Sequence, residues 1–264
     1  MSDSVYTHLP YVEFEQLLNL KGKTAVVTGG SDGIGFAISR RLAEAGATVV
    51  AGSRTPGKTE ELFPKYPGMH VVCDVTKHED IEHIFQKTKE TYGTVDILVN
   101  NAGVYPLKPI FEITEEFWDR VYHINIKAQF FAAQTAGRYM IEQGTGGVIL
   151  NLSSICGHRP MNNHVTYDST KGAVLSMTRS LAKDLGQYNI RVNSISPGLT
   201  ATPGNLDPEL LAEHERMGTL EHIALKRRGE PYELASAALF LCAPISSYVT
   251  GTDLLVDGGW ATTL

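Results

Sequence analysis

Tyr167 and Lys171 lie four residues apart, a spacing that could support acid/base chemistry. If the segment is helical, residues i and i+4 share one face, so an ammonium lies beside a phenol. A tyrosine ordinarily titrates near ~10, and a neighbouring cation favours the phenolate and lowers that pKa. The pair could then donate and accept protons near neutral pH. By itself, the same spacing is also typical of a solvated helix face.

A glycine-rich turn, Thr-Gly-Gly-Ser-Asp-Gly-Ile-Gly at 28–35, is the second segment that could do chemistry. Glycines let the backbone approach a pyrophosphate, and the N–H groups at a helix N-terminus favour an anion. The alternative is a flexible turn between a strand and a helix. The glycine spacing is G-x-x-x-G-x-G rather than the commoner G-x-G-x-x-G.

Short β-branched runs alternate with helical patterns along the chain, which predicts βαβ units and a parallel sheet. We expect strands at 24–28, 48–52, 70–73, 97–100, 147–152, 191–195 and 253–256, and helices near 34–46, 79–92, 114–143, 166–188 and 231–243. The expected fold is α/β: a doubly wound (Rossmann-like) parallel seven-stranded sheet with helices on both faces, in a single domain at 23–264. An N-terminal extension, 1–22, precedes it. The Pro- and Gly-containing segment at about 200–228, with a short helix at 208–217, is expected to be a lid or a surface excursion.

Charge, apolar runs and cysteine spacing argue against several classes of function. The net charge of −6, with no basic run, argues against nucleic acid or an anionic membrane as the main partner. No apolar stretch approaches the ~18 residues that a membrane span needs, and the first twenty residues lack a signal-peptide pattern. The cysteines, Cys73, Cys156 and Cys242, are isolated, without metal-ligand spacing, so we expect no metal, no disulfides and a cytoplasmic location.

The motifs occur in an order that closely resembles the short-chain dehydrogenase/reductase family, from about Lys23 to Gly259. They are the glycine turn, Asn100-Asn101-Ala102-Gly103, Asn125, Ser154, Tyr167-x-x-x-Lys171 and Pro197-Gly198. The resemblance implies hydride transfer between a nicotinamide and a small alcohol or carbonyl substrate.

In that reaction Ser154 would hold the carbonyl oxygen and Tyr167 would be the general acid/base. Lys171 would lower the phenol pKa and bind the nicotinamide ribose, and Asn125 would form a helix irregularity that holds a water near Lys171. Ser153 competes with Ser154 for its role, and the thirteen-residue offset to Tyr167 favours Ser154.

The cofactor contacts are expected over the turn and the strand ends. The expected residues are Gly29, Ser31, Asp32, Gly33, Ile34, Gly35, Ser53, Arg54, Asp74, Val75, Asn101, Ala102, Gly103, Tyr167, Lys171, Pro197, Gly198, Leu199 and Thr202. Thr200 competes with Thr202 for the nicotinamide carboxamide. Ser53 stands where NAD-binding folds usually keep an acid, and the guanidinium of Arg54 pairs well with a 2′-phosphate. We therefore favour NADP(H), although Asp32 would repel that phosphate, and NAD(H) is the second candidate.

The resemblance also implies a homotetramer that pairs the long helices near 114–143 and 166–188. The polar residues His158, Asn162, Asn163 and His164 are expected to border the substrate and favour a polar one. The alternative function is a non-catalytic dinucleotide-binding regulator on the same scaffold, which would be expected to have lost a member of the Ser/Tyr/Lys set.

Overall fold

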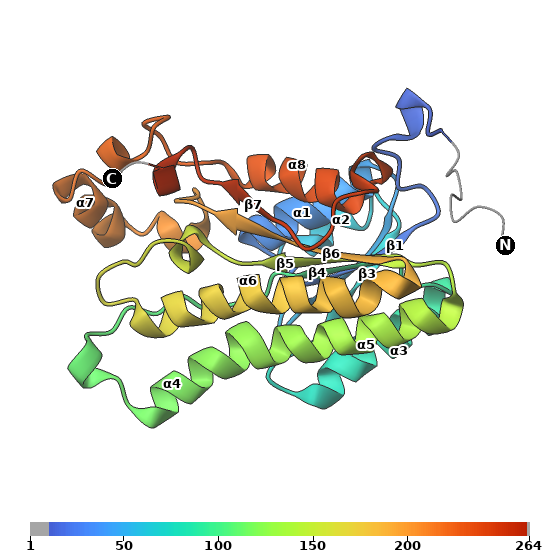
Figure 1. The fold of residues 1–264 in the computed structure, drawn as a ribbon, viewed down its shortest axis with the longest axis horizontal. Helices are drawn as coiled ribbons and strands as arrows, with labels where there is room; N and C mark the ends of the chain where they lie inside the picture. Colours follow the sequence, from blue (N-terminus) through green and yellow to red (C-terminus); the bar gives the residue numbers. More distant parts are fainter. Residues whose placement is uncertain (1–10, 263–264) are drawn as a thin grey trace, which may run out of the picture.

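The protein, seen here as a computed structural model that describes residues 11–262, is built on one seven-stranded parallel sheet (Figure 1). The strand order is β3-β2-β1-β4-β5-β6-β7. The strands are β1 (Thr24–Thr28), β2 (Thr48–Ser53), β3 (Gly68–Val72), β4 (Ile97–Asn100), β5 (Gly147–Leu152), β6 (Ile190–Pro197) and β7 (Asp253–Val256). The expected doubly wound, single-domain α/β fold is confirmed.

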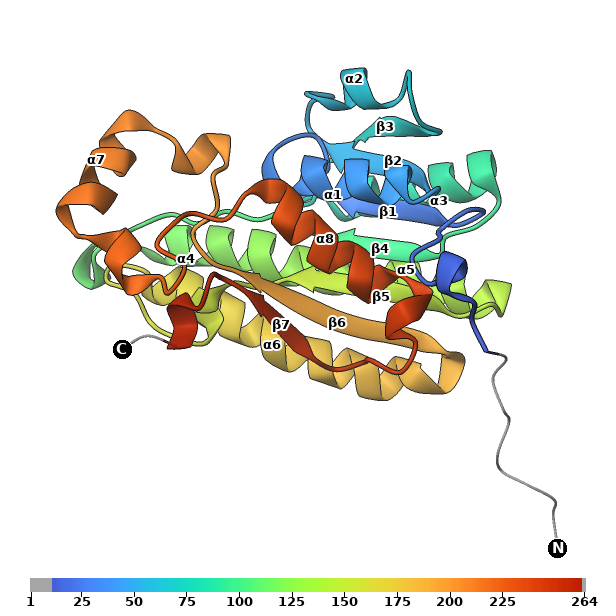
Figure 2. The same ribbon diagram turned by 90° about the horizontal axis from the view of Figure 1, so that it is seen from above.

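Helices cover both faces of the sheet. Figure 1 shows α3, α5 and α6 on one side and α1 and α8 on the other, and Figure 2 shows α2 beside the edge strand β3. The helices are α1 (Gly33–Glu44), α2 (Thr59–Leu62), α3 (His78–Tyr92), α4 (Glu115–Tyr122), α5 (Ala128–Gln143), α6 (Val165–Leu185), α7 (Pro208–Arg216) and α8 (Pro231–Cys242). None of the described helices combines the length and apolarity that crossing a membrane requires.

Two hydrophobic cores, one on each face, explain why the strands read as continuous apolar runs. Successive side chains of a strand point to opposite faces. Val27 and Val49 therefore pack in the core that contains α1 and α8. Val26 and Val50 pack in the other core, which contains α3 and α5. Burial on both faces favours mostly apolar residues along each central strand, as is typical of parallel sheets.

The pattern expected as one helix over 114–143 is interrupted at its centre. A π-helical segment, His123–Lys127, separates α4 from α5, and the Ala128 N–H donates to the His123 carbonyl. Such single π turns occur frequently at functional sites. Other boundaries also differ from expectation: β2 ends at Ser53, β3 spans Gly68–Val72, β6 spans Ile190–Pro197, and α6 gives way to a 3-10 turn after Leu185.

Part of the expected N-terminal extension packs on the body of the domain. Leu20 is 2% exposed and its N–H donates to the Ala45 carbonyl at 2.8 Å. The Ile245 N–H donates to the Leu17 carbonyl at 3.0 Å. Phe14, in contrast, is 79% exposed. Residues 1–10 of that extension lie outside the described residues.

The carboxyl ends of all seven strands meet at one edge of the sheet, because the strands are parallel. The strand order reverses between β1 and β4, and ligands of open α/β sheets bind outside such a switch point. The segment that follows β6, including α7, projects at this edge (Figure 1). The fold therefore gathers the glycine turn and the ends of β4, β5 and β6 around one region.

Candidate active site

Ser154 lies close enough to Tyr167, at the carboxyl end of β5, for its side chain to lower the pKa of the phenol. Ser154 caps the short 3-10 turn that follows this strand, and its Oγ also accepts the Cys156 N–H at 3.1 Å. The neighbouring serine, Ser153, instead donates its hydroxyl to the Lys171 carbonyl at 2.9 Å. Of the two loop serines, Ser154 is therefore the one placed to share a substrate oxygen with Tyr167.

Lys171 lies one turn after Tyr167 on α6 and is 4% exposed. Its Nζ donates to the Leu152 carbonyl at 2.8 Å and lies 5.5 Å from the centre of the Tyr167 ring. Burial lowers the pKa of Lys171 to about 8. Burial also raises the pKa of Tyr167, an effect that the Ser154 side chain partly opposes. The expected lowering of the phenol pKa by the lysine is not found in this structure, where Tyr167 is protonated at neutral pH.

Asn125 is fully buried in the π-helical segment, so the expected helix irregularity is present. Its Oδ1 accepts the Val104 N–H at 2.9 Å, and its Nδ2 donates to the Val104 carbonyl at 2.9 Å and to Thr170 Oγ1 at 3.1 Å. The side chain thus fastens the loop after β4 to α6, one residue before Lys171. Its role in holding a water stays a prediction.

The glycine turn at the start of α1 is shaped so that only glycine fits at its closest approaches. Gly29 and Gly33 have φ of +64° and +53°, which side chains rarely adopt. A Cβ at Gly35 would lie 2.2 Å from the Gly29 carbonyl oxygen. Asn101 Nδ2 donates to the carbonyls of Thr28 and Gly29 at 3.0 and 3.1 Å, which fixes the turn against β4. Ile34 follows in the first turn of α1. This bare backbone at a helix N-terminus suits a pyrophosphate.

A lysine that the sequence reasoning missed lies beside the glycine turn. Lys58 Nζ is 2.7 Å from Asp32 Oδ1, and the Lys58 N–H donates to the Ser31 carbonyl at 3.0 Å. The hydrogen bond to Lys58 lowers the pKa of Asp32. Asp32 also caps α1 by accepting the Gly33 N–H at 2.8 Å. The residues Pro-Gly-Lys at 56–58 indicate a turn after β2. The sequence does not show that Lys58 pairs with Asp32, because this ion pair forms only in the fold.

The end of β2 carries Ser53 and Arg54. The Ser53 hydroxyl donates to the Thr55 carbonyl at 2.6 Å and lies 2.9 Å from His70 Nε2. Burial lowers the pKa of His70, so its ring is neutral at neutral pH. Arg54 is exposed, and its guanidinium makes no hydrogen bond or ion pair with another described residue. An exposed cation therefore lies at the end of β2, with the acids Glu60 near His70 and Asp74 near Arg54.

The segment after β3 lies next to the switch point. Asp74 Oδ1 accepts the Thr76 N–H and hydroxyl at 3.0 and 2.8 Å, and these bonds lower the pKa of Asp74. Val75 and Ala102 line one small cavity beside the ends of β1 and β4. The adjacent Gly103 faces the site, because a Cβ there would lie 3.8 Å from Lys171 Nζ.

The segment 197–199 leads from β6 into the expected lid. Thr200 is 2% exposed and its hydroxyl donates to the Gly198 carbonyl at 3.0 Å. Thr202 instead approaches the glycine turn, since a Cβ at Gly33 would lie 3.6 Å from its Cγ2. Thr202 is therefore the threonine of the pair that is placed toward the cofactor turn.

The side chains around Tyr167 are more apolar than the polar residues of the loop at 158–164 predict. His158 turns away, with Nε2 at 2.8 Å from Asp253 Oδ2 on β7, and it does not border the Ser154–Tyr167 pair. His164 packs edge-on against the Tyr167 ring, with ring centroids 5.8 Å apart. The remaining neighbours form a small apolar cluster of Ile155, Cys156, Ile223 and Trp260, with Met161, Leu199 and Leu220 packed against it.

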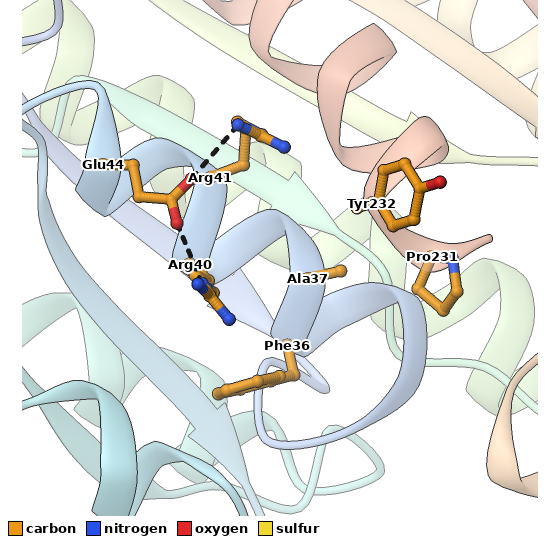
Figure 3. Close-up of a pocket in the computed structure, with 7 residues that line it drawn as sticks. All are labelled: Phe36, Ala37, Arg40, Arg41, Glu44, Pro231 and Tyr232. Atoms are coloured by element: carbon orange, nitrogen blue, oxygen red, sulfur yellow. Dashed lines mark hydrogen bonds and ion pairs between the residues drawn. The ribbon is translucent and has the colours of Figure 1, made fainter.

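A separate hollow lies between α1 and α8 (Figure 3). Its volume is about 420 Å³, and Phe36, Ala37, Arg40, Arg41, Glu44, Pro231 and Tyr232 line it. Glu44 pairs with both arginines, at 2.8 Å to Arg40 and 3.1 Å to Arg41. It shares no residue with the Ser154–Tyr167 region.

Comparison with known proteins decides the family. The family model described as Enoyl-(Acyl carrier protein) reductase matches residues 29–261. The chain belongs to the short-chain dehydrogenase/reductase family. It is therefore an NAD(P)(H)-using oxidoreductase that acts on alcohol or carbonyl groups.

Its relatives within this family act on different substrates. The chain is 37% identical to a 3-oxoacyl-[acyl-carrier-protein] reductase of Thermotoga maritima, covering 92% of this chain and 99% of the relative. It is 38% identical to L-xylulose reductase of Bos taurus, covering 93% and 99%. A 7α-hydroxysteroid dehydrogenase, solved with NADH and 7-oxo glycochenodeoxycholic acid, is 34% identical with a TM-score of 0.86, covering 94% and 98%.

Proposed function

We propose that this dehydrogenase/reductase interconverts a small carbonyl compound and its alcohol with NADP(H), using Tyr167 as general acid/base. The proximity of the Ser154 and Tyr167 side chains carries the proposal. Two neighbouring hydroxyls at the carboxyl edge of the sheet can both reach one substrate oxygen. The buried Lys171 ammonium, 5.5 Å from the phenol ring, supplies the positive charge that favours developing negative charge there.

The cradle of Gly29, Gly33 and Gly35 fits the pyrophosphate of a dinucleotide, which when bound supplies or accepts the hydride. In the reductive direction the carbonyl carbon gains that hydride, and the Tyr167 hydroxyl gives its proton to the carbonyl oxygen. Ser154 donates a hydrogen bond that stabilises the charge developing on this oxygen.

Two further groups complete the proposed site. Lys171 holds the nicotinamide ribose hydroxyls, and Asn125 positions a water that returns the proton to Tyr167. The raised pKa of Tyr167 supports the role of acid, since the phenol keeps its proton at neutral pH.

The preference for NADP(H) is supported by the charges beside the glycine turn. Asp32, which would repel a 2′-phosphate, is paired with Lys58 at 2.7 Å. Arg54 is exposed nearby. Ser53 and the neutral His70 add hydrogen-bonding groups without negative charge. NAD(H) is the second candidate, favoured by the NADH bound in the structure of the steroid dehydrogenase relative.

The surroundings of Tyr167 favour a small carbonyl compound with an apolar portion. The cluster of Ile155, Ile223 and Trp260 offers no charged group to a substrate. Tyr105 packs on the lid, because a Cβ at Gly204 would overlap its hydroxyl. The lid at about 200–228 would close over this wall.

We also propose a cytoplasmic homotetramer. Apolar side chains are exposed along the long helices, with Trp118 at 36%, Phe130 at 38% and Val165 at 42%. Pairing of α4–α5 and α6 with copies of themselves would remove this surface from water.

A panel of ketones and aldehydes tests the function. Purified protein is mixed with NADPH or NADH and each carbonyl, and loss of reduced-cofactor absorbance is followed. Turnover of at least one carbonyl, faster with NADPH, is expected. If the protein binds NADPH but turns over no carbonyl or alcohol, a non-catalytic dinucleotide-binding regulator is the better description.

A further inference from the structure

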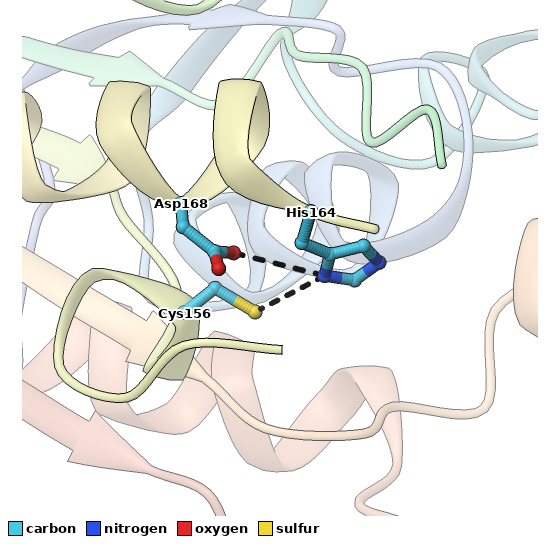
Figure 4. A group of neighbouring side chains, drawn as sticks. All are labelled: Cys156, His164 and Asp168. Atoms are coloured by element: carbon cyan, nitrogen blue, oxygen red, sulfur yellow. Dashed lines mark hydrogen bonds and ion pairs between the residues drawn. The ribbon is translucent and has the colours of Figure 1, made fainter. Parts of the chain in front are cut away.

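Beside the catalytic pair, three potential metal ligands lie close together (Figure 4). Cys156 Sγ, His164 Nδ1 and a carboxylate oxygen of Asp168 all lie within 4.8 Å of one another. The Sγ–Nδ1 distance is 3.8 Å and the Nδ1 to Asp168 Oδ1 distance is 3.7 Å. Met161 Sδ adds a second sulfur, 3.5 Å from Cys156 Sγ.

These separations match those between the ligands of a tetrahedral ion. Bonds of about 2.0–2.3 Å to N, O and S at tetrahedral angles place ligand atoms about 3.3–3.8 Å apart. Thiolate, imidazole and carboxylate are the ligands that Zn²⁺ takes in proteins. We infer that Cys156, His164 and Asp168 bind one Zn²⁺ ion, with Met161 closing the fourth side.

The backbone holds the ligands in place before any ion arrives. His164 and Asp168 are four residues apart at the start of α6, a spacing that puts two ligands on one helix face. Cys156 lies in the short turn after β5, which Ser154 caps. The N–H of Met161 donates to Asp168 Oδ2 at 3.0 Å, which holds the Met161 backbone beside the cluster. Little rearrangement is needed for binding.

One buried acceptor atom of the cluster has no hydrogen-bond donor among the described residues. Asp168 Oδ1 is buried and accepts no hydrogen bond from a described residue, although a buried acceptor left unsatisfied is costly. The apolar surroundings of Ile155, Ile223 and Trp260 exclude competing water. A cation at this point would satisfy Oδ1 and would replace the thiol proton of Cys156, which leaves to solvent as the S–Zn bond forms.

An ion here would change the acidity of the catalytic tyrosine. Cys156 donates its N–H to Ser154 Oγ, and His164 packs on the Tyr167 ring, so the site adjoins both catalytic hydroxyls. Because the thiol proton leaves as Zn²⁺ binds, the site gains one net positive charge, which would favour the phenolate of Tyr167 and lower its pKa. Zinc binding itself does not depend on the proposed reaction.

The test uses the full chain, freed of metal with a chelator. Zn²⁺ is titrated against a chromophoric chelator, and Co²⁺ is added separately to detect a thiolate-to-metal absorption band. One Zn²⁺ per chain and a cobalt–thiolate band are expected. Cys156→Ser and His164→Gln should each weaken Zn²⁺ binding by at least about tenfold, since each removes a ligand. Cys242→Ser, which removes a buried thiol outside the cluster, should bind as the wild type does.

Circular dichroism melts show whether each variant is folded, and His164→Gln, at a side chain that is 14% exposed, serves if Cys156→Ser does not fold. The inference is overturned if the wild type binds no Zn²⁺ at micromolar concentration, or if a folded ligand variant keeps wild-type affinity and stoichiometry. These readouts need no turnover, so they stand or fall separately from the proposed reduction.

Discussion

The Nζ atom of Lys171 lies 5.5 Å from the centre of the Tyr167 ring. The same Nζ is held by the carbonyl of Leu152, at the end of β5, rather than by an acid. The sheet therefore fixes the ammonium, while the helix turn between positions 167 and 171 fixes its distance from the phenol. Removing the Lys171 ammonium from water without a carboxylate partner costs free energy. Burial therefore lowers the pKa of Lys171 to about 8.

Burial of Lys171 gives a pH dependence of stability. Its folded pKa, about 8, is below its ordinary value of 10.5, so between these values the unfolded chain binds more protons. The free energy of unfolding from this group therefore rises with pH from about 8 to 10.5. Denaturant unfolding of wild type and Lys171→Met across this range should show the difference shifting in favour of the wild type as pH rises. A flat or falling difference would contradict the burial of a charged lysine.

Ser154 and Ser153 offer a matched pair of substitutions. Ser154→Ala should lower kcat about 10²–10³-fold, because it removes a hydrogen bond to the developing oxyanion. Ser153→Ala should keep kcat within a few-fold and lower the unfolding free energy by about 1 kcal/mol, through loss of its bond to the Lys171 carbonyl. Steady-state kinetics and urea unfolding of both variants separate these effects. Equal losses of kcat would show that the two serines are not distinguished.

Cofactor choice should depend on the cations beside the glycine turn. Arg54→Ala and Lys58→Ala should each weaken NADPH binding about tenfold, since each removes an attraction to the phosphate. NADH affinity should change little. Adding Asp32→Asn to Lys58→Ala should restore part of the NADPH affinity, because the acid freed from Lys58 no longer repels the phosphate. Fluorescence titration measures both affinities, and unchanged NADPH binding in Arg54→Ala would refute the phosphate argument.

The glycine turn predicts a contrast between two glycine-to-alanine substitutions. Gly35→Ala should abolish dinucleotide binding and destabilise the fold, because its Cβ would lie 2.2 Å from the Gly29 carbonyl oxygen. Gly137→Ala, inside α5, should be neutral or stabilising by up to about 1 kcal/mol. Its Cβ would meet Leu185 at an ordinary 3.7 Å. Thermal melts with and without NADPH check both, and a dinucleotide-binding Gly35→Ala would contradict the cradle.

The elements that could be predicted from sequence are those with strong local signals. The first, fourth, fifth and seventh strands have the expected bounds, because buried β-branched runs end at turn residues. β6 extends to Pro197, since pairing with β7 continues there. The break at His123–Lys127 has no apolar periodicity of its own, so the pattern over 114–143 reads as one helix.

At the site, residue types and order predicted which residues gather, but not how they pair. The Asp32–Lys58 ion pair joins two turns that meet only in the fold. The cluster of Cys156, His164 and Asp168 likewise escapes a search for metal-ligand spacing, because the cysteine comes from a separate turn. The phenol pKa depends on burial, which motif spacing does not contain.

The most direct test of the account is single-turnover reduction of an accepted carbonyl by Tyr167→Phe. The substitution removes the hydroxyl and keeps the ring that packs on His164. A loss of about 10²–10⁴-fold in the reduction rate is predicted, the contribution typical of a general acid, with NADPH binding retained. Equal reduction rates in wild type and Tyr167→Phe would contradict the assignment of Tyr167 as the proton donor.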